Sequence, residues 1–234
     1  MVREDSTKKT FKMTPKNIDL FFAALEKATP NPQTELVSTN PYTLLVAVVL
    51  SAQSTDKGVN RATEDLFKKI HTPRDMIQFG EENLRNAIKT IGLYKTKAKN
   101  ILKLSHILEE KFKGTIPNTR EDLESLPGVG RKTANVVLNV VFGLPTFAVD
   151  THIFRVSNRT GLAPGKTPLA VETILEAIVP EKFRNIAHHL LILHGRYTCK
   201  AQKPLCPVCP VKNLCTYEFK TQEPMTRLSK KANF

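Results

Sequence analysis

A glycine-rich turn near the middle of the chain precedes residues that could carry out chemistry on an anionic substrate. The segment LESLPGVGRKTANVV places Gly128 and Gly130 in a tight turn between two expected helices, with Lys132 in the first turn of the second helix. Glycine allows a ligand to approach the backbone closely, and the free N–H groups of a helix N-terminus attract anions. Further along the chain, Asp150 is expected to cap another helix. This helix, hairpin and helix predicts a phosphate grip with a lysine and a carboxylate beside it, which favours chemistry on DNA.

Lys132 stands where a cation is normally unfavourable, because the positive end of a helix dipole lies at the N-terminus. The dipole and the neighbouring Arg131 would both favour a neutral amine, which is the nucleophilic form of lysine. Asp150 could assist deprotonation and stabilise positive charge that develops on the substrate. The alternatives are that Lys132 is a solvated surface residue and that Asp150 serves only as a helix cap.

All four cysteines lie in one C-terminal segment, with the spacing Cys199-x6-Cys206-x2-Cys209-x5-Cys215. Clustered cysteines in a chain without a secretory signal favour a metal site over disulfides. Both a four-cysteine zinc site and a 4Fe–4S cluster could use these thiolates. Zinc usually binds two C-x-x-C pairs, and only the middle pair has that spacing here, so the wider outer gaps favour the 4Fe–4S cluster. Four reduced free thiols are the remaining alternative.

The chain is strongly basic, with 35 Lys and Arg against 22 Asp and Glu and a net charge of +13. This excess favours a polyanionic partner, of which nucleic acid is the commonest, although a solvated basic surface is the alternative. Lys200 and Lys203 lie in the KAQKPL loop between the first two cysteines. A bound metal centre would hold this loop rigidly and present both ammonium groups to phosphate. A solvated loop is again the alternative.

Length and hydropathy allow one large domain or two smaller ones, since the chain has 234 residues and 41% of them are hydrophobic. No apolar run approaches the ~20 residues that a membrane-spanning helix needs. The N-terminal segment MVREDSTKKTFKM contains no apolar signal region. We therefore expect a cytoplasmic protein with no membrane association.

The elements that must position these residues are expected to be helices throughout. The segment YTLLVAVVLSAQ is apolar on all sides and predicts a central buried helix, with a buried strand as the alternative. No segment shows sustained alternation of apolar and polar residues, so we predict an all-α fold. Helices are expected over residues 15–29, 42–53, 57–70, 81–91, 95–112, 133–142, 151–159, 168–178 and 181–194, and further helices are expected to start at Pro73 and Thr119.

The LPGVGRKTA turn, the VDTHI segment and the four-cysteine pattern together resemble the endonuclease III family of bifunctional DNA glycosylases, in the helix–hairpin–helix superfamily. The resemblance extends from roughly residue 14 to residue 217 and includes the LSAQSTD and IGLYKTKA segments. It implies a six-helix barrel domain with the helix–hairpin–helix over residues 34–144. Residues 1–33 and 145–234 would form a discontinuous helical iron–sulfur cluster domain with a disordered C-terminal tail. The four cysteines would hold a 4Fe–4S cluster, and DNA would lie in the cleft between the domains.

The resemblance also implies a reaction. Lys132 matches the family's Schiff-base nucleophile and Asp150 its partner carboxylate, so the protein is expected to remove oxidised pyrimidines from damaged double-stranded DNA in base excision repair. The damaged nucleotide would be flipped out of the duplex. Lys132 would attack the sugar C1′, and β-elimination would cut the strand 3′ to the lesion, which is the AP lyase activity. A monomer associated with the nucleoid is expected.

The remaining expected site residues contact DNA. Gln53 in LSAQ and Leu93 in IGL match the residues that fill the gap left by the extruded base, although Leu93 could simply be an apolar contact at a helix end. His152 could be either a packing residue or a phosphate contact. The expected DNA-binding set is Gln53, Leu93, Gly128, Gly130, Arg131, His152, Lys200 and Lys203.

Two other functions remain open. The adenine glycosylase branch shares the cysteine spacing, but it lacks the hairpin lysine and adds a C-terminal domain, whereas only a short segment follows Cys215 here. A non-catalytic DNA-binding or redox module could use the hairpin and the cluster alone. The pair of Lys132 and Asp150 favours the bifunctional enzyme over both.

Overall fold

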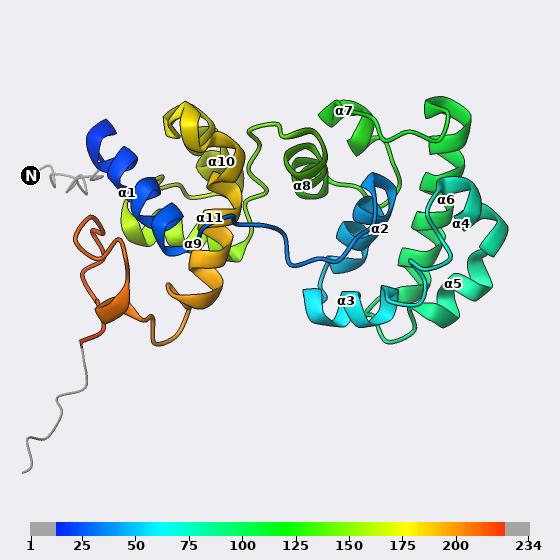
Figure 1. Ribbon diagram of the computed structural model, residues 1–234, viewed down its shortest axis with the longest axis horizontal. Helices are drawn as coiled ribbons and strands as arrows, with labels where there is room; N and C mark the ends of the chain where they lie inside the picture. Colours follow the sequence, from blue (N-terminus) through cyan, green and yellow to red (C-terminus); the bar gives the residue numbers. More distant parts are fainter. Residues whose placement is uncertain (1–12, 223–234) are drawn as a thin grey trace, which may run out of the picture.

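The computed structural model describes residues 13–222, and this part of the chain is helical with no strand. The expected all-α fold is therefore confirmed. Two lobes lie side by side (Figure 1). One lobe contains α1 (Pro15–Ala28), α9 (Thr151–Thr160), α10 (Pro168–Ile178), α11 (Arg184–Tyr197) and the 3-10 turns η1 (Glu181–Phe183) and η2 (Cys206–Val208). The other lobe contains α2 (Pro41–Ser51), α3 (Asp56–Thr63), α4 (Pro73–Phe79), α5 (Glu81–Ala87), α6 (Tyr94–Phe112), α7 (Arg120–Glu124) and α8 (Arg131–Phe142).

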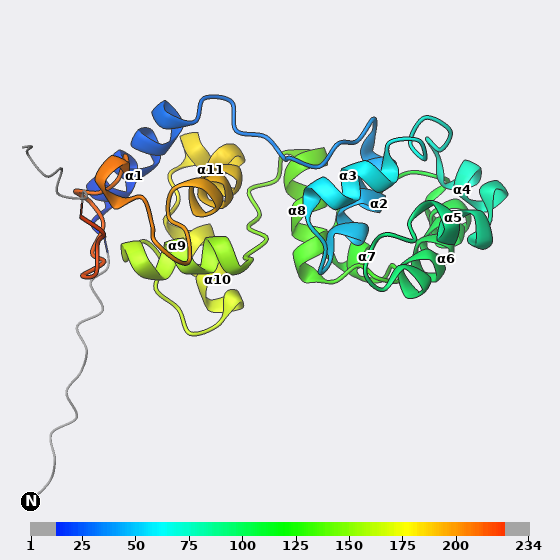
Figure 2. The ribbon, with the colours of Figure 1, turned by 90° about the horizontal axis from the view of Figure 1, so that it is seen from below.

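Two extended segments connect the lobes (Figure 2). Residues 29–40 lead from α1 to α2, and residues 143–150 lead from α8 to α9. The last of these residues is Asp150, so the second connection delivers a carboxylate to the junction between the lobes. Among the described residues, no helix is both long and apolar enough to cross a membrane. The C-terminal tail expected to be disordered lies almost entirely outside the described residues.

The helix α2 lies at the centre of its lobe, and every residue from Tyr42 to Leu50 is buried. A capping box starts the helix: the Asn40 side chain accepts from the Thr43 N–H, while the Thr43 hydroxyl oxygen accepts from the Asn40 N–H, both at 3.0 Å. The expected central buried helix is thus confirmed, and the strand alternative is wrong. An apolar surface on all sides suits this helix because other elements surround it.

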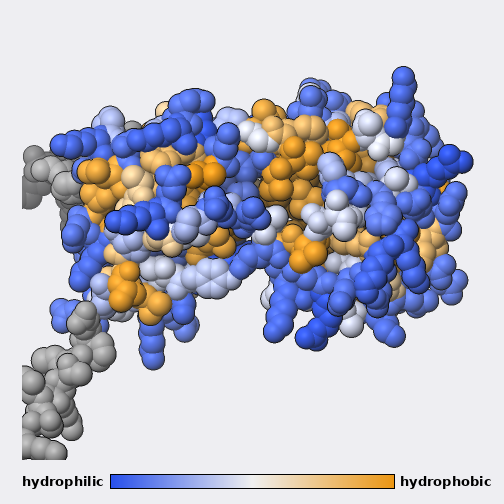
Figure 3. Space-filling view, viewed as in Figure 1, coloured by the Kyte–Doolittle hydropathy of each residue, from blue (hydrophilic) through white to orange (hydrophobic). Residues whose placement is uncertain are grey.

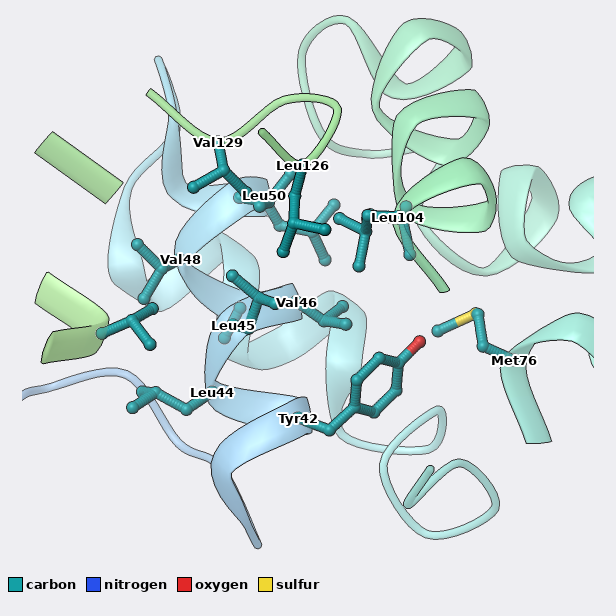
Figure 4. Close-up of a cluster of buried hydrophobic side chains, with 14 of the residues drawn as sticks. Tyr42, Leu44, Leu45, Val46, Val48, Leu50, Met76, Leu104, Leu126 and Val129 are labelled. Carbon is teal, nitrogen blue, oxygen red and sulfur yellow. The ribbon is translucent and has the colours of Figure 1, made fainter. Parts of the chain in front are cut away.

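The core around α2 also anchors the turn that precedes α8. Met76 of α4, Leu104 of α6, and Leu126 and Val129 of the turn pack around α2 (Figure 4). The Tyr42 hydroxyl is hydrogen-bonded to the Ser105 hydroxyl at 2.6 Å within this core. Because two buried apolar side chains hold it, the glycine-containing turn has a fixed position at the surface.

The second lobe has its own hydrophobic core. Phe21 and Phe22 of α1 are fully buried against α9, α10 and α11, and the rings of Phe22 and Phe183 lie 5.7 Å apart. Phe147 and Val149, from the second connection, belong to the same core. They tie the residues just before Asp150 to this lobe, so the position of Asp150 depends on packing outside its own helix.

Three of the expected helices differ from the structure in their boundaries. The helix expected over residues 57–70 ends at Thr63, whose hydroxyl donates to the Val59 carbonyl at 3.0 Å, a contact that often bends helices. The helix expected over residues 81–91 ends at Ala87, and a tighter turn then buries Ile91. The helix expected over residues 181–194 begins as the 3-10 turn η1, and its α-helical part runs to Tyr197.

Candidate functional site

A cleft of about 730 Å³ lies between the two lobes. It is lined by residues of both lobes, including four of the expected site residues: Gln53, Lys132, Asp150 and His152. Apolar side chains gather on each lobe, with hydrophilic groups around and between them (Figure 3). The fold thus brings the expected nucleophile and its expected carboxylate partner to one cavity, although they belong to different helices.

The hairpin before α8 places Lys132 at the mouth of this cleft. Gly128 has a left-handed backbone with φ +81°, and a Cβ there would lie 3.2 Å from the Asn100 side chain. Gly130 is the N-cap of α8 and is exposed, and as a glycine it has no side chain to accept from the first N–H groups of the helix. Apart from its chain neighbours, a Cβ on Gly130 would meet no atom of the described residues within 4 Å. The N-terminus of α8 is therefore open to an anion from solvent.

Asp150 caps α9 as expected. Its Oδ1 atom accepts from the backbone N–H groups of His152 and Ile153, each at 2.9 Å. Both bonds use the same oxygen, so Oδ2 has no partner among the described residues. The two bonds give two free N–H groups at the start of α9 a side-chain partner. This half-buried carboxylate is thereby held rigidly at the wall of the cleft.

Arg131 has an intramolecular partner that the sequence did not indicate. Its guanidinium donates to both carboxylate oxygens of Glu172 on α10, at 2.8 to 3.2 Å. Hydrogen bonding to Glu172 raises the pKa of Arg131. The predicted DNA contact of Arg131 stays a prediction, while its observed contact joins the start of α8 to the other lobe.

Gln53 and Leu93 lie in neighbouring turns at the edge of the α2 lobe. Both are exposed, and both have left-handed backbones, with φ of 55° for Gln53 and 58° for Leu93. A Cβ on Gly92 would lie 3.9 Å from the Gln53 carbonyl oxygen, so the two turns approach closely. Leu93 is 61% exposed and does not line the cleft itself. Strained residues of this kind are concentrated at functional sites.

The remaining expected DNA contacts fall in two places. His152 lines the cleft, and its Nδ1 atom lies 3.2 Å from the Arg155 guanidinium. Lys200 and Lys203 are exposed but do not line the cleft, because they lie in the loop that follows α11. Arg159 donates to the Lys200 carbonyl at 2.6 Å. This hydrogen bond holds the loop against α9 and does not depend on a bound metal.

The four cysteines line one small cavity between α9, α11 and the loop that follows α11. Among the described residues, no three His, Cys, Asp or Glu side chains converge closely enough to hold one metal ion. Four cysteine thiolates are the donor set of a 4Fe–4S cluster and also of a four-cysteine zinc site. Burial raises the pKa of Cys209 to about 11, and burial also raises that of Cys215. Both thiols would need a bound metal centre to ionise at neutral pH.

Sequence reasoning missed several residues of the cleft. His188 and His189 of α11 line it, and burial lowers the pKa of His188 to about 3, so this imidazole is neutral. Arg196 of the same helix donates to Asp56 at 2.6 Å and also to Glu35, and thus joins the two lobes. The segment HHLLILHGR carried a signal, because polar residues are unexpected in an otherwise apolar helix. Nothing in the sequence, however, indicated their partners.

Residues 46–181 match the HhH-GPD superfamily of base excision DNA repair proteins. The chain is 54% identical over 202 residues to endonuclease III of Rickettsia conorii, covering 86% of this chain and 96% of that protein. It is 55% identical over 196 residues to endonuclease III of Escherichia coli strain K12, covering 84% and 93% of the two proteins. The solved structure of a trapped endonuclease III–DNA covalent intermediate, an estranged-adenine complex, has a TM-score of 0.80 at 48% identity and covers 87% of this chain and 96% of that chain.

Proposed function

Because the chain belongs to the HhH-GPD superfamily of base excision DNA repair proteins, we propose that it removes oxidised pyrimidines from double-stranded DNA and cuts the strand at the abasic site. It is a base excision repair enzyme that combines DNA glycosylase and AP lyase activity. The observation that carries the proposed chemistry is that Lys132 and Asp150 line one cleft beside the hairpin. This pairing disfavours both a glycosylase without a catalytic lysine and a module that only binds DNA.

The proposed reaction starts with extrusion of the damaged nucleotide into the cleft, because its C1′ atom cannot be attacked inside the duplex. The neutral amine of Lys132 forms a bond to C1′, and the glycosidic bond breaks with its electron pair leaving on the base. Loss of the amine proton and opening of the sugar ring give an imine. The imine acidifies the C2′ proton, and its removal breaks the C3′–O bond, so that the phosphate leaves and the strand is cut.

Asp150 is proposed to serve this reaction through its free oxygen. The cap bonds to Oδ1 fix the carboxylate, and Oδ2 is left to accept the proton of the attacking amine. The same negative charge stabilises the positive charge that develops on the sugar. His188 and His189 line the same cleft as Lys132. Burial lowers the pKa of both imidazoles, so neither adds a positive charge to the cleft at neutral pH.

DNA is proposed to bind across the cleft, with the hairpin N–H groups on a backbone phosphate. The open N-terminus of α8 supports this, as does the net charge of +13. Lys200 and Lys203 would extend the phosphate contacts along the cysteine loop. Gln53 and Leu93 would occupy the gap in the duplex, and we further propose that the enzyme acts as a monomer at the nucleoid.

The four cysteines are proposed to hold a 4Fe–4S cluster. The cavity that the four cysteines share and the wide outer gaps in their spacing support this group. When bound, the cluster supplies a cross-link that holds the loop of Lys200 and Lys203, and no step of the reaction passes through it. Iron analysis of anaerobically purified protein should find about four irons per chain; stoichiometric zinc without iron would contradict the proposal.

Trapping of the imine tests the proposed function. Borohydride added during turnover on a duplex with one oxidised pyrimidine should reduce the imine and leave a covalent protein–DNA adduct at Lys132. Lys132→Gln should lose the adduct and strand cleavage but retain lesion binding. Removal of the base without any adduct would favour the glycosylase that lacks a catalytic lysine, and binding without either reaction would favour the non-catalytic module.

A further inference from the structure

Lys97 is a buried lysine at the end of the first turn of α6, only 6% exposed. Its ammonium donates to the Leu50 carbonyl at 2.9 Å, the Ala52 carbonyl at 2.6 Å and the Ser54 hydroxyl at 3.1 Å. These three acceptors use all three protons of an ammonium group. A buried charge is tolerated only where it is satisfied in this way. Lys97 does not line the cleft, so it is not a second nucleophile.

The acceptors lie at the C-terminus of α2, which ends just before Gln53. The Leu50 and Ala52 carbonyls belong to the end of a helix, where carbonyl groups lack intrahelical partners and the dipole is negative. Ala52 and Ser54 are the residues on either side of Gln53. The ammonium of Lys97 therefore holds the backbone and the side chain that flank Gln53.

The same residue also contacts the second turn. The backbone N–H of Lys97 donates to the Leu93 carbonyl at 3.0 Å, in the hydrogen bond that starts α6. Gln53 and Leu93 both have left-handed backbones, which non-glycine residues avoid unless their surroundings enforce them. The neighbours Lys95 and Lys99 are exposed, whereas Lys97 hydrogen-bonds to both turns.

We propose that Lys97 is a positioning residue that holds Gln53 and Leu93 in the geometry needed to fill the gap when the damaged nucleotide leaves the duplex. This inference rests on the proposed function and assigns a role to a residue outside the cleft. Without the ammonium, the turn after α2 would relax away from the turn before α6. Extrusion of the nucleotide would then slow, whereas attack on a nucleotide that is already unpaired would not.

The test compares two substrates under single-turnover conditions. One is a duplex with the oxidised pyrimidine paired opposite a purine, and the other carries the same lesion in an unpaired bubble. Lys97→Met keeps the length of the side chain and removes the charge. It should slow cleavage of the paired substrate about tenfold, equivalent to ~1.4 kcal/mol, and slow the bubble substrate less than about twofold. The exposed Lys103→Met on the same helix is the control and should match wild type on both.

A second comparison separates positioning from general loss of stability. In a Gln53→Ala, Leu93→Ala background, Lys97→Met should cause no further slowing on the paired substrate, because its effect passes through those two residues. Ser54→Ala removes one of the three acceptors and should give a smaller defect with the same preference for the paired substrate. Equal slowing on both substrates, or effects that simply add in the triple variant, would overturn the proposal. Absence of cleavage and of any borohydride adduct in wild type would instead overturn the proposed function.

Discussion

The Arg131 guanidinium and the buried Glu172 carboxylate form an ion pair at 2.8 Å, between the first residue of α8 and the middle of α10. Glu172 also accepts from the Asn135 side chain at 3.0 Å, so α8 is attached to it at two successive turns. The residue after Arg131 is Lys132. The orientation of the proposed nucleophile toward the cleft is therefore set in part by a carboxylate from the other lobe.

Glu172→Gln should destabilise the protein and slow its chemistry. The amide keeps the shape of the side chain but leaves Arg131 without its counter-charge. Because the Arg131 side chain is 43% exposed, solvent screens part of the loss, and we expect about 1–3 kcal/mol in denaturant unfolding. Glu176→Gln, on the same helix and more exposed, should cost less than about 1 kcal/mol. If Glu172→Gln and Glu176→Gln have the same free energy of unfolding, the ion pair of Arg131 and Glu172 does not hold α8 in place.

Asp150→Asn should separate chemistry from folding. Asparagine caps a helix nearly as well as aspartate, so the melting temperature should change little. The single-turnover cleavage rate should fall by about 10²-fold or more, because the proposed general base and its negative charge are lost. Asp150→Ala should lower stability as well, by about 1 kcal/mol. A wild-type cleavage rate in Asp150→Asn would show that Asp150 serves only as a helix cap and has no role in the chemistry.

The two hairpin glycines should respond differently to alanine. Gly130 has open space around it and φ of −100°, so Gly130→Ala should fold normally. It should still bind duplex DNA more weakly, because we propose that a phosphate approaches the Gly130 backbone. Gly128 has φ of +81° and crowds Asn100, so Gly128→Ala should lose stability by about 1 kcal/mol or more. Thermal unfolding and DNA titration of both variants provide the check. Unchanged affinity in Gly130→Ala would contradict the hairpin grip.

The cysteine loop should contribute to the salt dependence of DNA binding. Removing the charges of Lys200 and Lys203 together should flatten the slope of log affinity against log salt by up to ~2, because two fewer phosphates are neutralised. Lys68→Met combined with Lys69→Met, at two exposed positions between α3 and α4, provides a matched loss of two positive charges. An unchanged slope in the loop variant would mean that this loop does not contact DNA.

His188 should make the protein less stable in mild acid. Its folded pKa, about 3, lies below the ordinary value of 6.5 because the imidazole is buried. The unfolded chain therefore binds more protons between these two values, and stability falls as the pH decreases from 6.5 toward 3. Between pH 6.5 and pH 5.5 the loss should be about 1 kcal/mol from His188 alone.

The measurement for His188 is denaturant unfolding of the holoprotein at several pH values. His188→Leu should show a shallower decrease in stability across that window, while His106→Leu at an exposed position should follow wild type. Buried His189 contributes in the same direction, since burial lowers its pKa too, so a residual slope should remain in His188→Leu. Identical slopes in His188→Leu and wild type would show that His188 is accessible to protons in the folded state.

Local features of the sequence determined most of the helices and the turn that carries the chemistry. Threonine or asparagine followed by proline starts four helices, and the helix expected over residues 168–178 has those bounds in the structure. The cap at Asp150 and the left-handed turn at Gly128 also follow from their own residues and nearest neighbours. Capping, turn geometry and helical periodicity act over a few residues, which is why the sequence alone predicts them.

Only the tertiary structure decided which charges are paired and which are left for the substrate. Lys97, Arg131 and Lys132 look alike in the sequence as basic residues near a helix start. In the structure Lys97 is enclosed at the end of α2, Arg131 is neutralised by Glu172, and Lys132 faces the cleft. Ala52, which accepts from Lys97, lies 45 residues away along the chain, and Glu172, the partner of Arg131, lies 41 residues away. No local pattern encodes such pairs, because they depend on how α2, α6, α8 and α10 come together and exclude water.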